Sequence, residues 1–360
     1  MRNRIKLLPI AAAAGVLTIT AATGAAAEAY KLRLGSGHPP GQHYVDLLHS
    51  FFVPQVKERV AARTSHTVDI LEAYSGSVVK VSETLVGVQN GIVDIGGMCY
   101  CFEPSRLQLH VFQAWAPFGT PDAATSLAIV HDMYNEMPEL SGTFEAKYDQ
   151  KVIALIGQNN YDIISKTPLE GLGSLRGMKI GGAGANLPWV GLAGAVPVQT
   201  SGPIMYTSLQ TGVYDGAIIH VSLADGLKLY EVAKNYAKVG FGSIAWHGLQ
   251  INLDTWNRLP KEVRDIIAEV GMEYEAKTGT YVNEFEVNGF KRLEGLGVKI
   301  AAVDAAEKAK WAAMLKDWPN EKAKEADKDG LPGTRTVNLL LSTAEKHGYK
   351  WPVRYEVTGK

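Results

Sequence analysis

The residues that could do chemistry are few and lie far apart in the chain. Gly181-Gly182-Ala183-Gly184 follows a predicted strand and resembles half of a dinucleotide-binding fingerprint, but the full glycine spacing and the later acidic residue are missing. His38 and His43 share one predicted loop, and a lone pair of histidines is more typical of pocket lining or surface than of a metal site. The sequence has no phosphate-loop, His-Glu-x-x-His or Gly-x-Ser-x-Gly frame. We therefore expect a protein that is not an enzyme and uses no cofactor or metal.

The chain has two cysteines, Cys99 and Cys101, which lie on a predicted strand. Residues i and i+2 of a strand point to the same face with Cα atoms roughly 6.5–7 Å apart, at or beyond the usual limit for a disulfide. No further Cys or His lies close enough in sequence to complete a metal site. We expect two buried thiols, with a disulfide as the alternative in an exported protein.

The first 27 residues have the layout of a secretory signal peptide. Three basic residues lie among the first six positions, an apolar run covers residues 7–20, and alanines occupy positions 25–27 before Glu28. The apolar run is shorter than the ~20 residues that span a bilayer. We favour a cleaved signal over a membrane anchor or an amphipathic core helix, and no cysteine follows that could carry a lipid. The mature protein is expected to begin near Glu28.

Charge is balanced over the chain, with 36 Lys and Arg against 37 Asp and Glu. Loss of the basic residues of the signal would make the mature protein mildly acidic. Nucleic-acid binding needs a concentrated basic surface, so we expect no nucleic-acid partner. A mature chain of this length exceeds one ordinary core and predicts two lobes.

The first half of the chain alternates strands and helices. Strands are predicted at residues 30–35, 67–73 and 91–96, separated by a helix at 44–63 and a short helix at 81–88. Strand, helix, strand at this spacing predicts an α/β unit with a mainly parallel sheet.

The pattern then restarts. Strands are predicted at residues 151–157, 162–165 and 175–181, and a helix at 206–212 leads into a strand at 213–219. Residues 89–94 and 210–215 share the frame Gln-x-Gly-(Ile/Val)-x-Asp, which indicates a second lobe built like the first unless the echo arose by chance.

A long helix is predicted at residues 261–293, after a strand at 248–253. At 1.5 Å per residue it could reach ~45 Å, enough to lie across both lobes. Gly271, Gly279 and Gly289 could break or bend it. The rest of the chain predicts a strand at 298–300, a helix at 305–318, one more helix after residue 331 and an extension at 351–352.

Several segments, in order, resemble a known family. Residues 88–95 run from a helix into a strand, 115–118 form a Pro-aromatic turn, and 175–180 read Leu-Arg-Gly-Met-Lys-Ile. Residues 196–198 and 206–216 carry the most specific match. Together they resemble the periplasmic binding proteins of tripartite ATP-independent periplasmic (TRAP) transporters, of the dicarboxylate-binding type.

The resemblance implies an α/β, two-lobed periplasmic binding protein fold with crossing hinge strands and a long helix bracing both lobes. Lobe 1 would hold residues 28–156 and about 244–275, lobe 2 residues 157–243 and about 276–330, and residues 331–360 would form a C-terminal extension. The protein would be periplasmic and mainly monomeric. It would enclose a small molecule by hinge closure and deliver it to TRAP membrane subunits that run on an ion gradient. A ligand-presenting sensor for a membrane kinase and an enzyme on this fold are the competing classes.

One departure from the family pattern concerns the ligand. Such proteins usually carry an arginine directly after the Lys-Ile of the second-lobe signature, where it clamps a carboxylate. Here Gly181 follows Lys179-Ile180, and no arginine occurs between Arg176 and Arg258. The resemblance therefore implies a pocket that is less charged and more apolar than usual.

Two kinds of ligand follow. An organic acid, slightly favoured, would be anchored by His220, His247, Lys166 or helix-end amides. A neutral or cationic molecule would instead lie among aromatic rings, with ordinary core packing as the alternative for each ring. The predicted ligand-binding residues are His38, Tyr74, Tyr100, Trp115, Asn159, Gly181, Gly182, Trp189, Tyr206, His220, Trp246 and His247.

Overall fold

The computed structural model describes residues 28–358. The predicted signal peptide therefore lies outside the described residues. Within residues 28–358, none of the helices combines the length and the apolar character needed to cross a bilayer.

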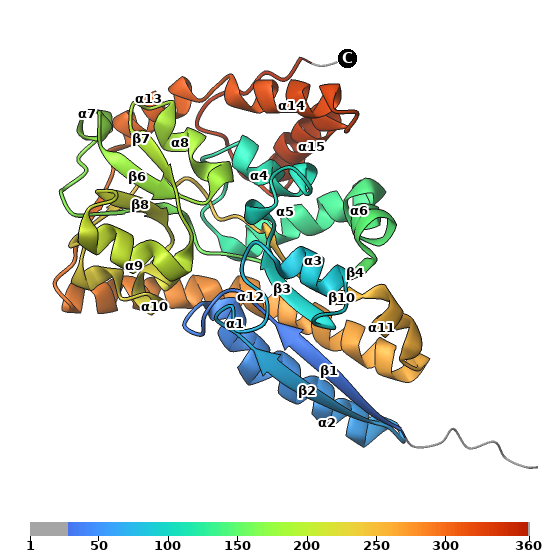
Figure 1. The fold of residues 1–360 in the computed structure, drawn as a ribbon. Coiled ribbons are helices and arrows are strands. Elements are labelled where there is room, and N and C mark those ends of the chain that lie inside the picture. The colour runs from blue at the N-terminus through green and yellow to red at the C-terminus, as the bar shows by residue number, and fades with distance from the viewer. Residues whose placement is uncertain (1–27, 359–360) are drawn as a thin grey trace, which may run out of the picture.

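The first lobe is built on a five-stranded sheet in the order β2-β1-β3-β10-β4 (Figure 1). The strands are β1 Ala29–Gly35, β2 Thr67–Ala73, β3 Ile95–Cys99, β4 Gln150–Ile156 and β10 His247–Asn252. β1, β2 and β3 are parallel, as predicted, but β10 is antiparallel to both of its neighbours. The prediction of a mainly parallel sheet is thus wrong for half of the pairings, because a late strand returns from the second lobe and inserts between β3 and β4.

Helices cover both faces of this sheet. Their bounds are α1 His43–Leu47, α2 Val53–Arg63, α3 Thr84–Gln89, α4 Phe112–Trp115, α5 Ala123–Glu136, α6 Pro138–Tyr148 and α11 Leu253–Arg258, with short 3₁₀ turns at Tyr100–Phe102 and Gln108–Val111. The single helix predicted at 44–63 is continuous, but its middle, Leu48–Phe52, is π-helical. Its apolar stripe at Val45, Leu48, Phe52 and Val56 is fully buried.

The second lobe is built on a six-stranded sheet in the order β11-β9-β5-β8-β6-β7. The strands are β5 Asp162–Ser165, β6 Lys179–Gly182, β7 Val196–Gln199, β8 Gly216–Ile219, β9 Asn235–Lys238 and β11 Lys299–Ala302. β6, β7 and β8 are parallel, and β5 is antiparallel to β8 and β9. The helices are α7 Leu172–Leu175, α8 Pro188–Gly191, α9 Gly202–Thr211 and α10 Val221–Gly226, with 3₁₀ turns at Gly184–Asn186 and Leu229–Glu231.

The shared sequence frame marks the same local structure in both lobes. In each frame the glycine has a positive φ, 64° and 77°, and ends the preceding helix. Asp94 then donates its N–H to the carbonyl of Arg33 and accepts from the N–H of Arg33 through Oδ2, both at 2.8 Å. Asp215 makes the same pair of bonds with Lys179, at 2.8 and 2.9 Å. In both lobes an aspartate fixes the start of one strand against its parallel neighbour.

The two lobes are joined by two adjacent chain segments and one helix. The Phe241 N–H donates to the carbonyl of Tyr161, the Tyr161 N–H donates to the carbonyl of Gly242, and Asn160 pairs with Ser243. The helix is α12, Lys261–Gly295, which packs on β4 of the first lobe and α10 of the second (Figure 1).

The glycines of α12 allow close packing and do not interrupt the helix. α12 is continuous over 35 residues. A Cβ on Gly271 would lie 2.7 Å from the carbonyl oxygen of Ile153, and one on Gly289 would lie 3.0 Å from Val221. The expected break is therefore absent, and the glycines lie where α12 packs closely against its neighbours.

The C-terminal part forms three helices: α13 Ala305–Met314, α14 Trp318–Lys328 and α15 Gly333–Lys346. α14 was not predicted, and the predicted helix at 305–318 ends at Met314. α14 and α15 pack on each other and on α4 and α5 (Figure 1). The Tyr355 hydroxyl donates to the carbonyl of Pro117 at 2.7 Å, so the tail returns to the core.

We expect Gly271→Ala to destabilise the protein by about 1–3 kcal/mol, because its Cβ would overlap the Ile153 backbone, which cannot yield as a flexible side chain would. The matched control is Gly295→Ala, where a Cβ meets nothing within 4 Å. That change should be neutral or stabilising by up to ~1 kcal/mol. Urea unfolding measures both, and equal stabilities of the two variants would contradict the close packing.

Candidate ligand-binding site

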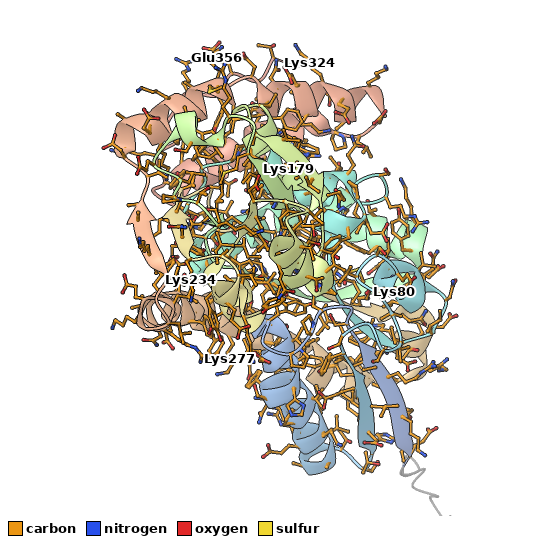
Figure 2. The ribbon with its side chains drawn as sticks, turned by 60° about the vertical axis from the view of Figure 1, so that its left-hand side comes forward. Lys80, Lys179, Lys234, Lys277, Lys324 and Glu356 are labelled. Atoms are coloured by element: carbon orange, nitrogen blue, oxygen red, sulfur yellow. A yellow bond between two sulfur atoms is a disulfide. The ribbon has the colours of Figure 1, made fainter. Side chains whose placement is uncertain are left out.

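A small cavity lies between the two lobes, with a volume of about 40 Å³. Among the described residues, its lining holds no lysine, arginine, aspartate or glutamate. Figure 2 shows the labelled Lys80, Lys179, Lys234 and Lys277 on the outside of the molecule, and all four are exposed. The lining is His38, Gln42, Cys99, Cys101, Phe102 and His247 from the first lobe, and Tyr161, Ala183, Asn186, Thr200, Ser201, Gly202, Met205, Ile218, Ile219, His220 and Leu223 from the joining segment and second lobe.

The sheet topology brings these residues together. In the second lobe, the cavity residues lie at or within a few residues after the ends of the parallel strands β6, β7 and β8. In the first lobe, His38 follows β1 and Cys99 ends β3, which is parallel to β1. The carboxyl ends of parallel strands meet at one edge of a sheet, and this edge is where open α/β sheets bind ligands. The two lobes turn these edges toward each other.

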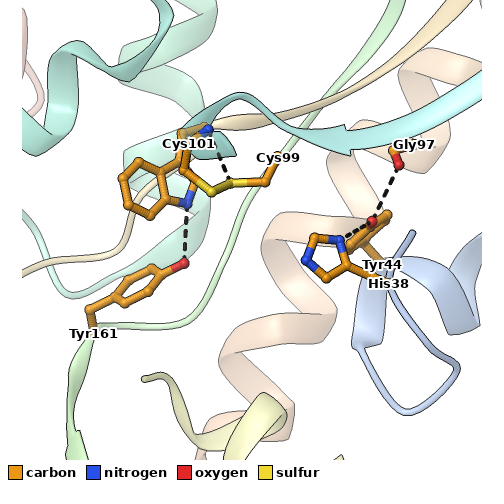
Figure 3. Close-up of a disulfide and its surroundings, with 7 residues drawn as sticks. His38, Tyr44, Gly97, Cys99, Cys101 and Tyr161 are labelled. Carbon is orange, nitrogen blue, oxygen red and sulfur yellow. Dashed lines mark hydrogen bonds between the residues drawn. A yellow bond between two sulfur atoms is a disulfide. The ribbon is translucent and has the colours of Figure 1, made fainter. Parts of the chain in front are cut away.

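Cys99 and Cys101 form a disulfide in the cavity wall, between Tyr161 and His38 in Figure 3. The expectation of two free thiols is wrong. β3 ends at Cys99, and the chain turns at Tyr100–Phe102 into a 3₁₀ turn. The two Cα atoms are therefore 5.2 Å apart, within disulfide range, and not at the spacing of an extended strand.

Four buried histidines gather at the junction of the lobes. The rings of His38 and His247 lie 5.8 Å apart, and those of His43 and His220 lie 5.9 Å apart. Burial lowers the pKa of His38 and of His43 to about 4. Burial, and then repulsion from the neighbouring histidines, holds the pKa of His220 and of His247 well below the usual value. All four rings are therefore neutral at pH 7.

Hydrogen bonds hold these rings in place. His38 Nδ1 lies 2.8 Å from the hydroxyl of Tyr44, and the two labelled side chains meet in Figure 3. His43 Nε2 lies 3.1 Å from the carbonyl oxygen of Gly157. Ser222 Oγ lies 3.1 Å from His43 Nδ1 and 2.7 Å from His220 Nδ1. Because His43 is on α1 and Ser222 is on α10, this contact joins the two lobes.

A helix end supplies further polarity. Ser201 is the N-cap of α9 and makes no side-chain cap hydrogen bond, and Gly202 begins the helix; both line the cavity. The N-terminus of a helix carries partial positive charge and free N–H groups, which suit an anion.

The structure brings part of the predicted residue set to the cavity. His38, His220 and His247 line it directly. Gly182 lies just behind it, since a Cβ there would be 2.6 Å from Asn186 Oδ1. Gly181 lies one step further away, against Tyr214.

Two of the aromatic residues predicted to surround a neutral or cationic ligand do not line the cavity. Trp189 and Trp246 stack on each other at 6.4 Å in the core. Their N–H groups donate to the carbonyl of Ala114 and to the hydroxyl of Tyr161. Trp246 thus supports Tyr161, which lines the cavity, from behind.

The remaining predicted residues lie elsewhere. Trp115 borders a separate surface groove beside Trp318. The hydroxyls of Tyr74, Tyr100 and Tyr206 bond to Glu72, Gln250 and Glu231, and Asn159 donates to the carbonyl of Val282. Lys166 lies near Gly212, at the turn after α9. None of these side chains lines the cavity formed by the described residues.

Sequence reasoning missed several lining residues, including Gln42, Phe102, Tyr161, Asn186 and Thr200. One signal was available: Ser201-Gly202-Pro203 lies a few residues before the predicted helix at 206–212, and Ser followed by Pro in the first turn is typical of a helix start. The others come together only through long-range packing.

A buried carboxyl group lies where the chain enters the second lobe. Asp162 is fully buried, and its Oδ1 accepts from the N–H of Gly240 at 2.8 Å. Burial, aided by repulsion from Glu286, raises the pKa of Asp162 to about 7. The folded protein therefore holds a proton that the unfolded chain releases above its ordinary pKa of ~4.

This shift predicts a pH-dependent effect of Asp162→Asn. A raised pKa in the folded state means that stability falls as pH rises from ~4 to ~7, and the loss remains complete above that range. Asn cannot ionise, so the variant does not lose stability in this way. Its free energy of unfolding relative to that of the wild type should therefore increase by on the order of 2 kcal/mol between pH 5 and pH 8. Urea unfolding at both pH values measures this, with the exposed Asp254→Asn as control. A stability difference that does not change with pH would contradict the prediction.

The two sheets face each other edge to edge with a cavity between them, and one helix packs on both lobes. This arrangement defines a two-lobed solute-binding protein. Residues 46–325 match the model of the bacterial extracellular solute-binding protein, family 7. The chain belongs to this family, whose members are solute-binding receptors. The predicted family and the predicted two-lobed α/β fold are confirmed.

Solved structures of TRAP solute-binding proteins share the fold. A protein from Rhodoferax ferrireducens T118, in complex with copurified benzoate, matches with a TM-score of 0.78 and 17% identity over 88% of this chain and 98% of that one. A marine metagenome protein specific for aromatic acid ligands, in complex with 3-hydroxybenzoate, matches with a TM-score of 0.76 and 22% identity over 90% of this chain and 100% of that one.

The similarity to curated relatives is partial. The sialic acid-binding periplasmic protein SiaP of Vibrio cholerae is 30% identical over 138 residues, which are 37% of this chain and 43% of SiaP. The chain thus spans less than half the length of the curated relatives it matches first.

Proposed function

We propose that the protein is the periplasmic receptor of a TRAP transporter, and that it captures a small organic acid between its lobes and hands it to the membrane subunits. The single observation that carries this proposal is the cavity between the lobes, lined by neutral hydrogen-bonding groups from both sides. The bound benzoate and 3-hydroxybenzoate of the two similar structures support an acid as the ligand class.

The cavity favours a monocarboxylate with an apolar body. His247 and the start of α9 supply hydrogen-bond donors for one carboxylate, and His220 adds a further hydrogen-bonding group to the same lining. Phe102, Ile218 and the Cys99–Cys101 disulfide supply apolar surface. A second carboxylate would need its own cation to offset its desolvation, and the lining residues of the described chain include none.

Binding requires the lobes to move. A cavity of about 40 Å³ is below the ~300 Å³ of an ordinary ligand site. We propose a hinge at the segments around Asn160 and Ser243, between lobe 1 (residues 28–156 and about 244–275) and lobe 2 (157–243 and about 276–330). The ligand would shift the population toward the form closed around it. Such a receptor releases its ligand unchanged, is not an enzyme, and acts as a monomer in solution.

Mass spectrometry of ligand released from the purified protein, followed by a thermal-shift screen of organic acids, tests this function. We expect a monocarboxylate in the released fraction and a rise in melting temperature with the same acid. Preference for a dicarboxylate or a cation would overturn the ligand class. Chemical conversion of the bound molecule would overturn the receptor function.

Replacing His220 by Ala should weaken binding of the identified acid at least tenfold, because a hydrogen-bonding group in the cavity is lost. Trp246→Ala should weaken it similarly, by removing the support behind Tyr161. Tyr206→Phe is the control, since its hydroxyl bonds to Glu231 outside the cavity. Isothermal titration calorimetry measures the affinities, and unchanged binding in both test variants would remove these residues from the site.

A further inference from the structure

Three buried side chains form a continuous hydrogen-bonded chain across the lobes. His43 on α1, and Ser222 and His220 at the start of α10, are each at most 1% exposed. His43 Nε2 lies 3.1 Å from the carbonyl oxygen of Gly157, and Ser222 Oγ lies between the two Nδ1 atoms at 3.1 and 2.7 Å. At its far end, the ring of His220 lines the cavity. We call this set the His43–Ser222–His220 chain.

The carbonyl of Gly157 sets the direction of every hydrogen bond in this chain. A carbonyl oxygen can only accept, so His43 Nε2 must carry a hydrogen. A neutral His43 then has a bare Nδ1, which must receive the single hydroxyl hydrogen of Ser222. Ser222 Oγ is left to accept, and the hydrogen it accepts must be on His220 Nδ1. The neutral His220 therefore has a bare lone pair on Nε2.

One longer contact is incompatible with a hydrogen on His220 Nδ1. The N–H of Leu223 lies 3.4 Å from His220 Nδ1, at the long limit of a hydrogen bond. The Ser222 contact at 2.7 Å to the same atom is much shorter. The direction imposed through His43 by the Gly157 carbonyl therefore decides the His220 tautomer in this structure, and the long Leu223 contact is the one given up.

We propose that closure of the lobes makes His220 Nε2 a hydrogen-bond acceptor in the cavity, so that the site takes its organic acid through a donor group: a hydroxyl, or a carboxylate that binds together with one proton. This inference rests on the proposed receptor function and names the group that the ligand presents to His220. It assigns Ser222 a positioning role, because Ser222 sets the His220 tautomer from behind.

The proton balance for a bare carboxylate is simple. One proton from solvent binds His220 Nε2, the ring becomes an imidazolium, and its new N–H donates to the carboxylate oxygen. The Nδ1–H bond to Ser222 is unchanged, and no covalent bond of the ligand breaks. A hydroxyl needs no such proton, since it donates its own hydrogen to Nε2.

The groups around a protonated His220 supply no negative charge to balance it, so the bound anion would have to do so. The titratable groups that face His220 are His43 on α1, His38 after β1, His247 on β10 and Tyr161 in the joining segment. The carboxylates of Asp225 on α10 and Asp46 on α1 are engaged elsewhere: Asp225 with Arg292 of α12 at 3.1 Å, and Asp46 with the N–H of Gly41 at 2.9 Å. Burial opposes a charge on His220, so the ring gains its proton only with the anion present.

Opening the lobes would reverse the tautomer. Away from His43, the Ser222 hydroxyl is free to donate to His220 Nδ1, and Leu223 N–H donates to the same atom as in an ordinary helix cap. His220 then carries its hydrogen on Nε2. The open and closed forms thus differ at one identifiable atom.

Histidine ¹⁵N NMR of the full chain tests the tautomers, with small-angle scattering to tell whether the protein in solution is closed or open. In the closed form we expect hydrogen on His43 Nε2 and on His220 Nδ1; in the open form we expect it on Nε2 of both rings. Ser222→Ala should return His220 to the Nε2–H form even when closed, whereas Ser208→Ala on α9 should change neither ring. A neutral His220 with Nε2–H in the closed wild type, or with Nδ1–H in the open one, would overturn the proposal.

Calorimetry with benzoate and 3-hydroxybenzoate tests the ligand group. Benzoate affinity should rise about tenfold for each pH unit lowered, with uptake of one proton seen in buffers of different ionisation enthalpy. 3-Hydroxybenzoate should lose less affinity as pH rises, and Ser222→Ala should flatten the benzoate dependence. Benzoate binding without proton uptake in the wild type would overturn the inference. If neither acid binds, the organic-acid function is contradicted for these ligands. The tautomer spectra then still test the hydrogen-bond directions in the His43–Ser222–His220 chain.

Discussion

The cost of placing an unpaired charge in a buried space governs the junction between the two lobes. Removing a charge from water without a partner costs several kcal/mol even after the protein relaxes. The cavity meets this constraint with neutral imidazoles, a hydroxyl and the start of a helix, and with the charged side chains of the described chain outside its lining. Recognition then depends on which atoms donate and which accept. The Gly157 carbonyl can only accept, and it sets which atom of His220 carries hydrogen, three hydrogen bonds away.

The rest of the fold holds these groups at fixed positions. Each lobe presents the ends of its parallel strands, and in each an aspartate anchors one strand to the next, at Asp94 and at Asp215. α12 packs on both lobes, and its glycines let it approach the Ile153 backbone of the first lobe and the Val221 side chain of the second. Much of the cavity lining therefore lies at or after strand ends, which suits a site whose hydrogen bonds depend on tenths of an ångström.

Local sequence patterns predicted the fold well but the site only in part. His38 was chosen as one of two histidines in a predicted loop, and His220 and His247 as anchors for an organic acid. His38 and His220 lie just after the ends of β1 and β8, where ligands of α/β sheets gather, whereas His247 begins β10. Trp189 and Trp246 were chosen for their type, yet type does not reveal whether a large ring faces a cavity or the core behind it. Cys99 and Cys101 were misjudged because their spacing depends on where β3 stops, and strand boundaries are uncertain by a few residues. Tyr161 and Gln42 could not be chosen, since only the packing of distant segments brings them to the cavity.

The Cys99–Cys101 disulfide closes a loop so short that chain-entropy arguments assign it only ~1–2 kcal/mol. Its two cysteines need no folded partner to meet, so under oxidising conditions the bond can form before the lobes assemble. The disulfide therefore contributes more to the shape of the cavity lining than to the stability of the fold. A preparation made in a reducing cytoplasm could therefore be well folded and thermally sound while carrying a different binding surface. Binding measured on this protein therefore depends on whether it was produced in an oxidising or a reducing compartment.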